Sequence, residues 1–198
     1  MHNGCILCGG TGSGKSITGL AYYFIRNGGT VEPMTKMVNP KDLYIITTAK
    51  KRDSGEWIGD MSWFYLTPDD ETKIYDHKVV IDSWNNIKKY ADVKNSFFIF
   101  DEQRVVGYGA WTKAFLKIAK SNEWILLSAT PGDNFMDYMP VFIANGFYKN
   151  KSEFTAEHCV YSRFSKFPQI ERIIGTERLN RLRRRVLVDM PYQNPAVQ

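Results

Sequence analysis

A glycine-rich octapeptide near the N-terminus constrains the fold of this chain more than any other segment. Residues 9–16 read Gly-Gly-Thr-Gly-Ser-Gly-Lys-Ser and match every fixed position of the pattern G-x-x-x-x-G-K-[ST]. An apolar run over residues 5–8 precedes the octapeptide, and an amphipathic helix is expected over 16–26. In a loop that joins a strand to a helix, glycines let the backbone N–H groups turn inward and surround an anion. The helix that follows adds its positive N-terminal end.

The octapeptide therefore predicts a phosphate-binding loop. Lys15 is expected to reach the β- and γ-phosphates of a nucleotide, and the Ser16 hydroxyl is expected to ligate Mg²⁺. The alternative is a purely structural glycine-rich turn, which the complete pattern disfavours. The residues expected to hold the phosphates are Gly9, Gly10, Thr11, Gly12, Ser13, Gly14, Lys15 and Ser16.

Short apolar runs alternate with helix-like stretches along most of the chain. Strands are expected over residues 5–8, 43–47, 79–82, 97–100 and 125–127. Strands that are apolar throughout are typical of a parallel sheet covered by helices on both faces. The pattern predicts an α/β fold, a three-layer α/β/α domain with a mostly parallel central sheet.

Two adjacent carboxylates, Asp101 and Glu102, follow the strand expected over 97–100. Ligands of an open parallel sheet bind beyond the carboxyl ends of its strands, so both carboxylates are expected to share a crevice with the phosphate loop. Asp101 is then placed to hold Mg²⁺, and Glu102 is placed to act as general base on the attacking water.

The next expected strand ends in Ser128, Ala129 and Thr130, followed by Pro131 and Gly132. Small hydroxyl residues at this place are candidates for coupling the acidic pair to a motion that accompanies hydrolysis. The alternative is an ordinary strand-to-loop turn ended by Pro-Gly.

Taken together, these segments resemble motifs I, II and III of superfamily 2 helicases and translocases, in the same order along the chain. The finer match is to the first half of the small Snf2-like helicases of bacteriophages. The segments that carry the resemblance are the octapeptide 9–16, Asp-Glu-Gln-Arg over 101–104, Ser-Ala-Thr-Pro over 128–131, and Asn-Gly-Phe-Tyr-Lys-Asn over 145–150.

The resemblance implies a RecA-like P-loop NTPase domain that binds Mg-ATP on one side and a DNA or RNA strand across its edge. Residues 47–52 stand where motif Ia of this family contacts the nucleic-acid backbone, which makes Thr48, Lys50, Lys51 and Arg52 candidate contacts, and Ser83 stands where a second contact is usual. The alternatives are a solvated basic loop for the lysines and the arginine, and a core position for the neighbouring Trp84.

The chain departs from the family pattern in two respects. Only eight residues precede Gly9, too few for the upstream segment whose Gln reads adenine in the family. The chain also ends before a second RecA-like domain, which in the family supplies an arginine finger, so weak ATPase activity is expected without that partner. The expected organisation is an ATP-binding domain over 1–150, a basic extension over 151–190 that packs on it or leads to the missing domain, and a loose tail over 191–198.

The positive charge of the chain is concentrated near its C-terminus. The whole chain has a net charge of +5, whereas the segment 163–185 alone has eight basic residues against two acidic ones. Arg183, Arg184 and Arg185 are therefore expected to contact nucleic acid or a second domain, and the alternative is a solvated face of a surface helix.

Composition excludes several classes. The apolar runs fall far short of the roughly 20 residues that span a bilayer, and no secretory signal is expected, since no basic segment and long apolar stretch open the sequence. A cytoplasmic protein is expected, in the host cell if a phage encodes it. Cys5 and Cys8 form a C-x-x-C, but a metal or redox site lacks further ligands, and both are expected to act as small hydrophobic residues.

Three functions remain open from the sequence. The first is the ATP-hydrolysing half of a nucleic-acid-dependent motor. The second is a DNA-packaging ATPase of the terminase type, which also pairs a phosphate loop with Asp-Glu. The third is a DNA-binding module that depends on a nucleotide but does not hydrolyse it.

Overall fold

The centre of the protein is a six-stranded parallel sheet. The computed structural model describes residues 1–68, 76–102 and 109–190, and the sheet has the strand order β10-β1-β7-β6-β4-β5. Every neighbouring pair in it is parallel. The strands are β1 (Ile6–Cys8), β4 (Leu43–Thr47), β5 (Val79–Ser83), β6 (Phe97–Asp101), β7 (Glu123–Ser128) and β10 (Leu187–Asp189).

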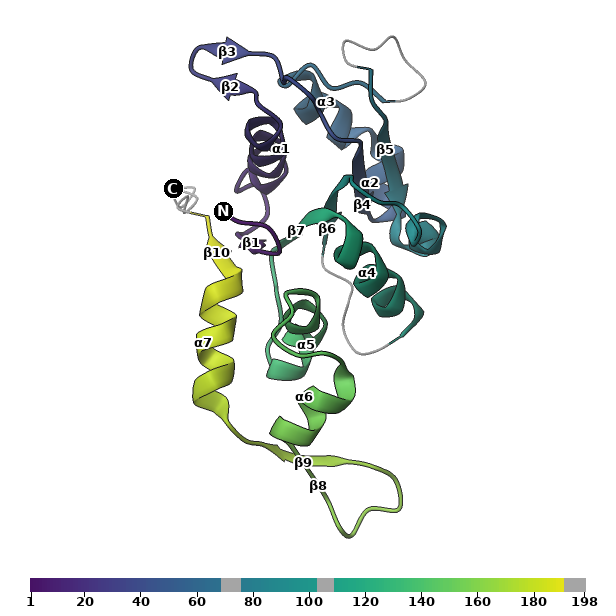
Figure 1. Cartoon of the computed structure of the whole chain (residues 1–198), viewed down its shortest axis with the longest axis vertical. Coiled ribbons are helices and arrows are strands. Elements are labelled where there is room, and N and C mark those ends of the chain that lie inside the picture. The colour runs from purple at the N-terminus through teal and green to yellow at the C-terminus, as the bar shows by residue number, and fades with distance from the viewer. Residues whose placement is uncertain (69–75, 103–108, 191–198) are drawn as a thin grey trace, which may run out of the picture.

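Helices cover both faces of this sheet (Figure 1). One face packs against α1 (Lys15–Arg26) and α3 (Glu56–Ser62). The other packs against η1 (Trp84–Tyr90), α4 (Ala110–Ser121) and α5 (Phe135–Ala144). The same core continues into α6 (Lys151–His158) and α7 (Thr176–Val186), which both contact α5. The short helix α2 (Ala49–Ser54) follows β4 and contacts β5 and α3. The predicted three-layer α/β/α fold with a parallel central sheet is thereby confirmed.

Side chains alternate between the two cores along each central strand. In β6, Phe98 and Phe100 enter the core on the side of α4, while Phe97 and Ile99 enter the core on the side of α1. Successive side chains of a strand point to opposite faces, so a strand buried on both sides must be apolar at every position. This requirement explains why all five strands expected from the sequence are present, with ends that differ by at most two residues.

The sixth strand was not predicted. β10 lies at the edge of the sheet beside β1, where Ile6 is paired with Leu187 and Cys8 with Asp189. It follows α7 directly, and no turn residue in the sequence marks where the helix ends and the strand begins. The region 151–190, expected to be an extension, therefore includes a strand of the central sheet, while the tail 191–198 lies outside the described residues.

Two small antiparallel hairpins project from the layers. β2 (Thr30–Val31) pairs with β3 (Met34–Thr35), and β8 (Cys159–Tyr161) pairs with β9 (Ile170–Ile173). None of the described helices is long and apolar enough to cross a membrane.

Part of the basic segment holds α7 against the domain. The Arg183 guanidinium lies 5.3 Å from the centre of the Phe135 ring, and that of Arg185 lies 5.0 Å from the centre of the Phe147 ring. Each such contact contributes about 0.5–1 kcal/mol at an exposed site. Arg184 instead lines a shallow hollow with Arg181. Of the three arginines expected to contact nucleic acid or a second domain, two therefore pack against aromatic rings of this domain.

A capping box begins α5, and it yields a prediction about stability. The Asn134 side chain accepts hydrogen bonds from the backbone N–H groups of Met136 (2.9 Å) and Asp137 (3.3 Å), and Asp137 accepts one from the Asn134 N–H (3.2 Å). Asn134→Ala is expected to lower the free energy of unfolding by about 1 kcal/mol, or Tm by roughly 2–4 °C. Thermal and urea denaturation followed by circular dichroism measure this. Asn134→Asp keeps the cap and is the control; equal destabilisation by both variants would contradict the capping role.

Candidate functional site

An open cleft of about 380 Å³ lies at the carboxyl ends of the central strands. Its walls come from four segments that the sequence singled out, including Lys51 of the segment 47–52, and from one that it did not, the helix α3. The lining residues are Thr11, Gly12, Ser13, Gly14, Lys15, Ser16, Ile17, Lys51, Glu56, Asp60, Asp101, Glu102, Leu127, Ser128 and Ala129. The structure thus brings the glycine-rich loop, the acidic pair and the end of β7 together in one cleft.

The loop between β1 and α1 has a backbone that requires glycine. Gly14 has φ = 83°, a left-handed conformation that costs other residues energy, and it precedes α1 without a side chain that caps the helix. At Gly9, a Cβ atom would lie 2.7 Å from Ser13 Oγ and 2.8 Å from Met190 Cγ. At Gly12, by contrast, a Cβ would meet nothing within 4 Å, so this position of the loop borders open space.

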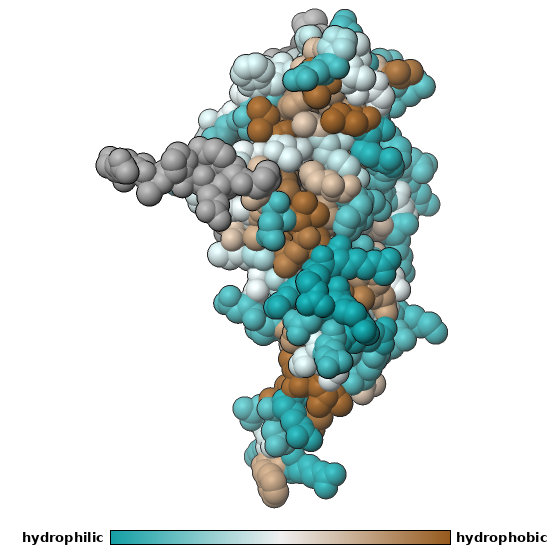
Figure 2. Space-filling model, turned by 90° about the vertical axis from the view of Figure 1, so that its left-hand side faces the viewer, coloured by the Kyte–Doolittle hydropathy of each residue, from teal (hydrophilic) through white to brown (hydrophobic). Residues whose placement is uncertain are grey.

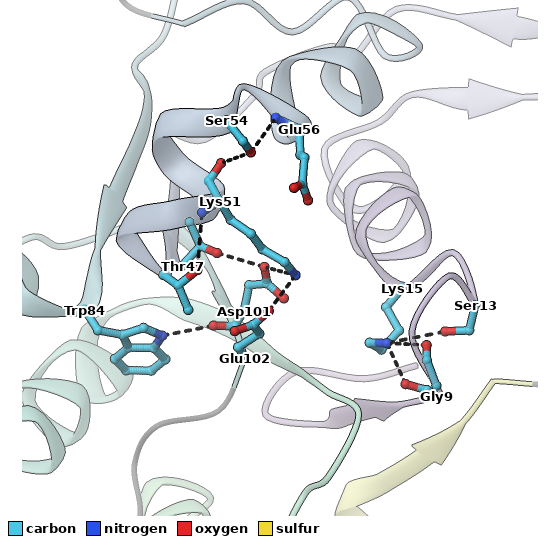
Figure 3. A network of polar contacts seen from close by, with 12 residues as sticks. Gly9, Ser13, Lys15, Thr47, Lys51, Ser54, Glu56, Trp84, Asp101 and Glu102 are labelled. Atoms are coloured by element: carbon cyan, nitrogen blue, oxygen red, sulfur yellow. Dashed lines mark hydrogen bonds and ion pairs between the residues drawn. The ribbon is translucent and has the colours of Figure 1, made fainter.

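The Lys15 ammonium lies at this loop. It donates hydrogen bonds to the carbonyl oxygens of Gly9 (2.5 Å) and Gly10 (2.7 Å), with Ser13 Oγ at 3.4 Å (Figure 3). Burial lowers the pKa of Lys15, and the positive charge of Lys51 lowers it further. A cation therefore lies at the loop where a phosphate is expected.

Asp101 is the last residue of β6 and is almost fully buried, with a side chain 2% exposed. Its Oδ2 accepts a hydrogen bond from the Thr47 hydroxyl at 2.9 Å. Its backbone carbonyl accepts one from the Trp84 indole N–H, also at 2.9 Å (Figure 3). These bonds fix the end of β6 between β4 and η1, and they give Trp84 the core position that the sequence favoured.

Glu102 departs from the geometry of the strand. Consecutive side chains of an extended strand point to opposite faces, so Asp101 and Glu102 would normally diverge. Glu102 has φ = 56°, a left-handed value that is uncommon for a residue other than glycine. With this backbone turn both carboxylates approach one group, the Lys51 ammonium, and Glu102 remains 41% exposed at the cleft. The strained residue therefore lies at the candidate reaction centre.

Lys51 occupies a place in the structure that the sequence did not predict. Its ammonium lies 3.1 Å from Asp101 Oδ2 and 3.0 Å from Glu102 Oε1, so it points into the cleft (Figure 3). Burial acts to lower the pKa of Lys51, but the charges and hydrogen bonds of the two carboxylates outweigh burial and raise it. The role expected for Lys51, contact with a nucleic-acid backbone, does not fit this orientation, because both carboxylates already engage its charge.

The other residues expected near β4 and β5 to contact nucleic acid differ in their exposure and in their polar partners. Thr48 caps α2 by accepting a hydrogen bond from the Lys51 N–H at 3.3 Å, and Lys50 is exposed. Arg52 forms ion pairs with Asp53 and Asp82. Thr48 also lines a separate hollow of about 210 Å³, together with Ala49, Ser83, Trp84, Asn85 and Trp111. Ser83 is the residue before η1, and its side chain forms no hydrogen bond that caps this helix.

Ser128 ties the end of β7 to the phosphate loop. β7 lies between β1 and β6, where Ser128 is paired with Cys8 and Leu127 with Asp101. The Ser128 carbonyl accepts a hydrogen bond from the Gly9 N–H at 3.2 Å, and its hydroxyl accepts one from the Thr130 N–H at 3.1 Å. A displacement of this strand end would therefore act on the loop directly.

The donor groups of the cleft fit a nucleotide with Mg²⁺. The Ser16 hydroxyl and the Asp101 carboxylate are hard oxygen ligands, and the acidic pair already holds one cationic group, the Lys51 ammonium, at close range. No described group of three His, Cys, Asp or Glu residues makes a metal site from protein ligands alone. Mg²⁺ commonly binds through one or two carboxylates plus substrate phosphates, which this cleft has room for.

Cys5 and Cys8 are free thiols, and burial raises the pKa of each.

Two acidic residues on α3, Glu56 and Asp60, also line the cleft. Burial raises the pKa of Asp60, and the negative charge of Glu56 raises it further. No motif marked these residues in the sequence, because their place at the cleft depends on how α3 packs beside α1. Gln103 and Arg104, which contributed to the resemblance, lie outside the described residues.

Comparisons with known proteins found matches among solved structures. No protein-family model and no curated protein sequence matches the chain. Among solved structures, a Hef helicase domain from Pyrococcus furiosus aligns with a TM-score of 0.48 at 17% sequence identity. The alignment covers 81% of this chain and 38% of that chain.

Proposed function

We propose that this protein is the ATP-binding domain of a nucleic-acid-dependent ATPase of the superfamily 2 helicase and translocase type, and that it belongs with the Snf2-like helicases of bacteriophages. The observation that carries the proposal is the shared cleft. Three segments that resemble motifs I, II and III meet there, although they are far apart in the sequence.

The proposed chemistry assigns a task to each polar group in the cleft. Lys15 and the loop amides neutralise the phosphates of ATP, and Glu102, which is partly exposed, orients and deprotonates the attacking water. Asp101 and Ser16 would hold Mg²⁺, which supplies charge neutralisation of the phosphate oxygens when bound. The fixed position of Asp101 against Thr47 and Trp84 keeps that ligand oriented.

The proposed partners are a DNA or RNA strand and a second RecA-like domain that closes the cleft, and the proposed setting is the host-cell cytoplasm. An arginine supplied across such a cleft contributes 10³–10⁵ in rate in related phosphoryl transfer. The ATPase activity of this chain alone is therefore expected to be weak, and the proposal calls for a sensitive measurement.

Single-turnover hydrolysis tests the proposal. With the protein in excess over radiolabelled ATP and with Mg²⁺ present, release of phosphate is expected, and single-stranded DNA or RNA is expected to accelerate it. Lys15→Ala is expected to lose both nucleotide binding and turnover. ATP binding without any hydrolysis would contradict the enzymatic part of the proposal, and hydrolysis that no nucleic acid accelerates would contradict the motor part.

A further inference from the structure

A narrow arm extends from the end of the protein opposite α1. It consists of β8, β9 and the loop 162–169 between them, and here it is called the arm (Figure 1). In the space-filling view it is a slender projection at the lower end of the molecule, where hydrophilic and hydrophobic surface lie side by side (Figure 2). The arm lies far from the nucleotide cleft, so it calls for an explanation of its own.

The loop of the arm contains a tandem repeat of three residues. Residues 162–164 read Ser-Arg-Phe, and residues 165–167 read Ser-Lys-Phe. Each triplet contains the same kind of internal hydrogen bond. The Phe164 N–H donates to Ser162 Oγ at 3.3 Å, and the Phe167 N–H donates to Ser165 Oγ at 3.4 Å. Each triplet therefore presents one basic and one aromatic side chain from a similar turn.

Both aromatic side chains are directed into solvent. Phe164 is 100% exposed and Phe167 is 75% exposed, although phenylalanine is among the residues most often buried in proteins. No acidic residue occurs between Glu157 and Glu171, so Arg163 and Lys166 give this part of the arm an uncompensated positive charge. Exposed aromatic rings that alternate with positive charges match the bases and phosphates of a single nucleic-acid strand.

The base of the arm is firmly held by the domain. His158, which is buried, lies with Nε2 2.6 Å from the Tyr148 hydroxyl and with Nδ1 2.9 Å from the Ile174 carbonyl oxygen. The Ile174 N–H donates to the His158 carbonyl at 2.8 Å, and the Ser162 N–H donates to the Gln169 carbonyl at 2.9 Å. An arm anchored in this way loses less conformational entropy on binding than a free loop would.

We propose that the arm is a binding site for single-stranded nucleic acid, in which Phe164 and Phe167 stack on bases while Arg163 and Lys166 contact phosphates. This inference rests on the proposed function and deepens it, because it names a nucleic-acid site that lies outside the cleft proposed to bind ATP. Charge complementarity selects the occupant, because an apolar protein surface would leave both cations of the tandem repeat without partners.

Fluorescence anisotropy with the whole chain tests the arm on labelled oligonucleotides, (dT)20 and (rU)20. Stacking on an aromatic side chain contributes about 1–3 kcal/mol per base, so the double variant Phe164→Ala, Phe167→Ala is expected to weaken binding at least tenfold. The double variant Arg163→Gln, Lys166→Gln is expected to weaken binding and to reduce the slope of log K against log salt by about 1.4, or 0.7 for each phosphate contact. If the aromatic variant binds both oligonucleotides more weakly, the arm stacks on the bases of DNA and RNA alike. If it binds only one of them more weakly, the proposal is supported and that oligonucleotide shows whether the arm binds DNA or RNA.

The control variant is Trp63→Ala, which removes another aromatic side chain, 67% exposed, that follows α3. It is expected to bind both oligonucleotides as the parent chain does, and circular dichroism checks that each variant is folded. Unchanged affinity in the aromatic variant would overturn the arm proposal while leaving the proposed function intact. Absence of any binding by the parent chain would instead contradict both, and the single-turnover measurement without nucleic acid would still report on the ATP site.

Discussion

Replacement of Glu102 by Gln is expected to lower the rate of ATP hydrolysis by 10²–10⁴-fold while Mg-ATP still binds. The variant keeps the size of the side chain but removes the group that accepts the proton from water. Binding is expected to persist because the proposed phosphate contacts come from the loop and from Lys15, whose ammonium is positioned by the carbonyl oxygens of Gly9 and Gly10.

Single-turnover hydrolysis and equilibrium nucleotide binding, measured on the same preparations, separate the two effects of Glu102→Gln. The matched control is Glu32→Gln, which makes the same chemical change at an exposed position between β2 and β3. A variant that lost nucleotide affinity in proportion to its rate would show that Glu102 acts in binding, and an unchanged rate would remove it from the proposed reaction.

The sequence predicted the fold well because its signals are strong where both faces of the sheet are covered. Strands such as Phe97–Asp101 are apolar at every position until their last residue, and the glycine-rich loop fixes which strand and helix adjoin it. The same logic placed Asp101 at the carboxyl edge of the sheet beside the loop. These predictions depend on short-range patterns that tertiary packing reinforces.

The features that the sequence did not reveal depend on long-range geometry. β10 has only three residues and no turn before it, and its identity as a strand comes from pairing with β1, more than 170 residues earlier in the chain. Lys50 and Lys51 are indistinguishable as letters, yet the cap at Thr48 sets the first turn of α2 so that Lys51 enters the cleft and Lys50 is exposed. The direction of one side chain therefore separates a surface charge from a site residue.

The position of Lys51 leads to a prediction about metal binding that does not depend on catalysis. Its ammonium compensates two adjacent carboxylates, of which Asp101 is buried. Lys51→Met removes the charge and retains most of the apolar stem, so the carboxylates lose their cationic partner. Removal of one partner of a fully buried ion pair costs about 3–5 kcal/mol, but Lys51 is 27% and Glu102 41% exposed, which reduces the expected loss of unfolding free energy to about 1–2 kcal/mol.

A divalent cation should restore what Lys51→Met removes. The uncompensated acidic pair is expected to bind Mn²⁺ in the absence of nucleotide at least tenfold more tightly than the parent chain does, as measured by electron paramagnetic resonance of free Mn²⁺. Because a ligand that binds only the folded state stabilises it by RT ln(1 + [L]/Kd), Mg²⁺ or Mn²⁺ is also expected to raise the Tm of the variant more than that of the parent. Lys50→Met removes the same charge one residue earlier and is expected to change neither quantity. Equal metal affinity in Lys51→Met and Lys50→Met would mean that the ammonium does not compete with a metal for Asp101, and that the ion pairs of Lys51 serve only to hold α2 beside the sheet.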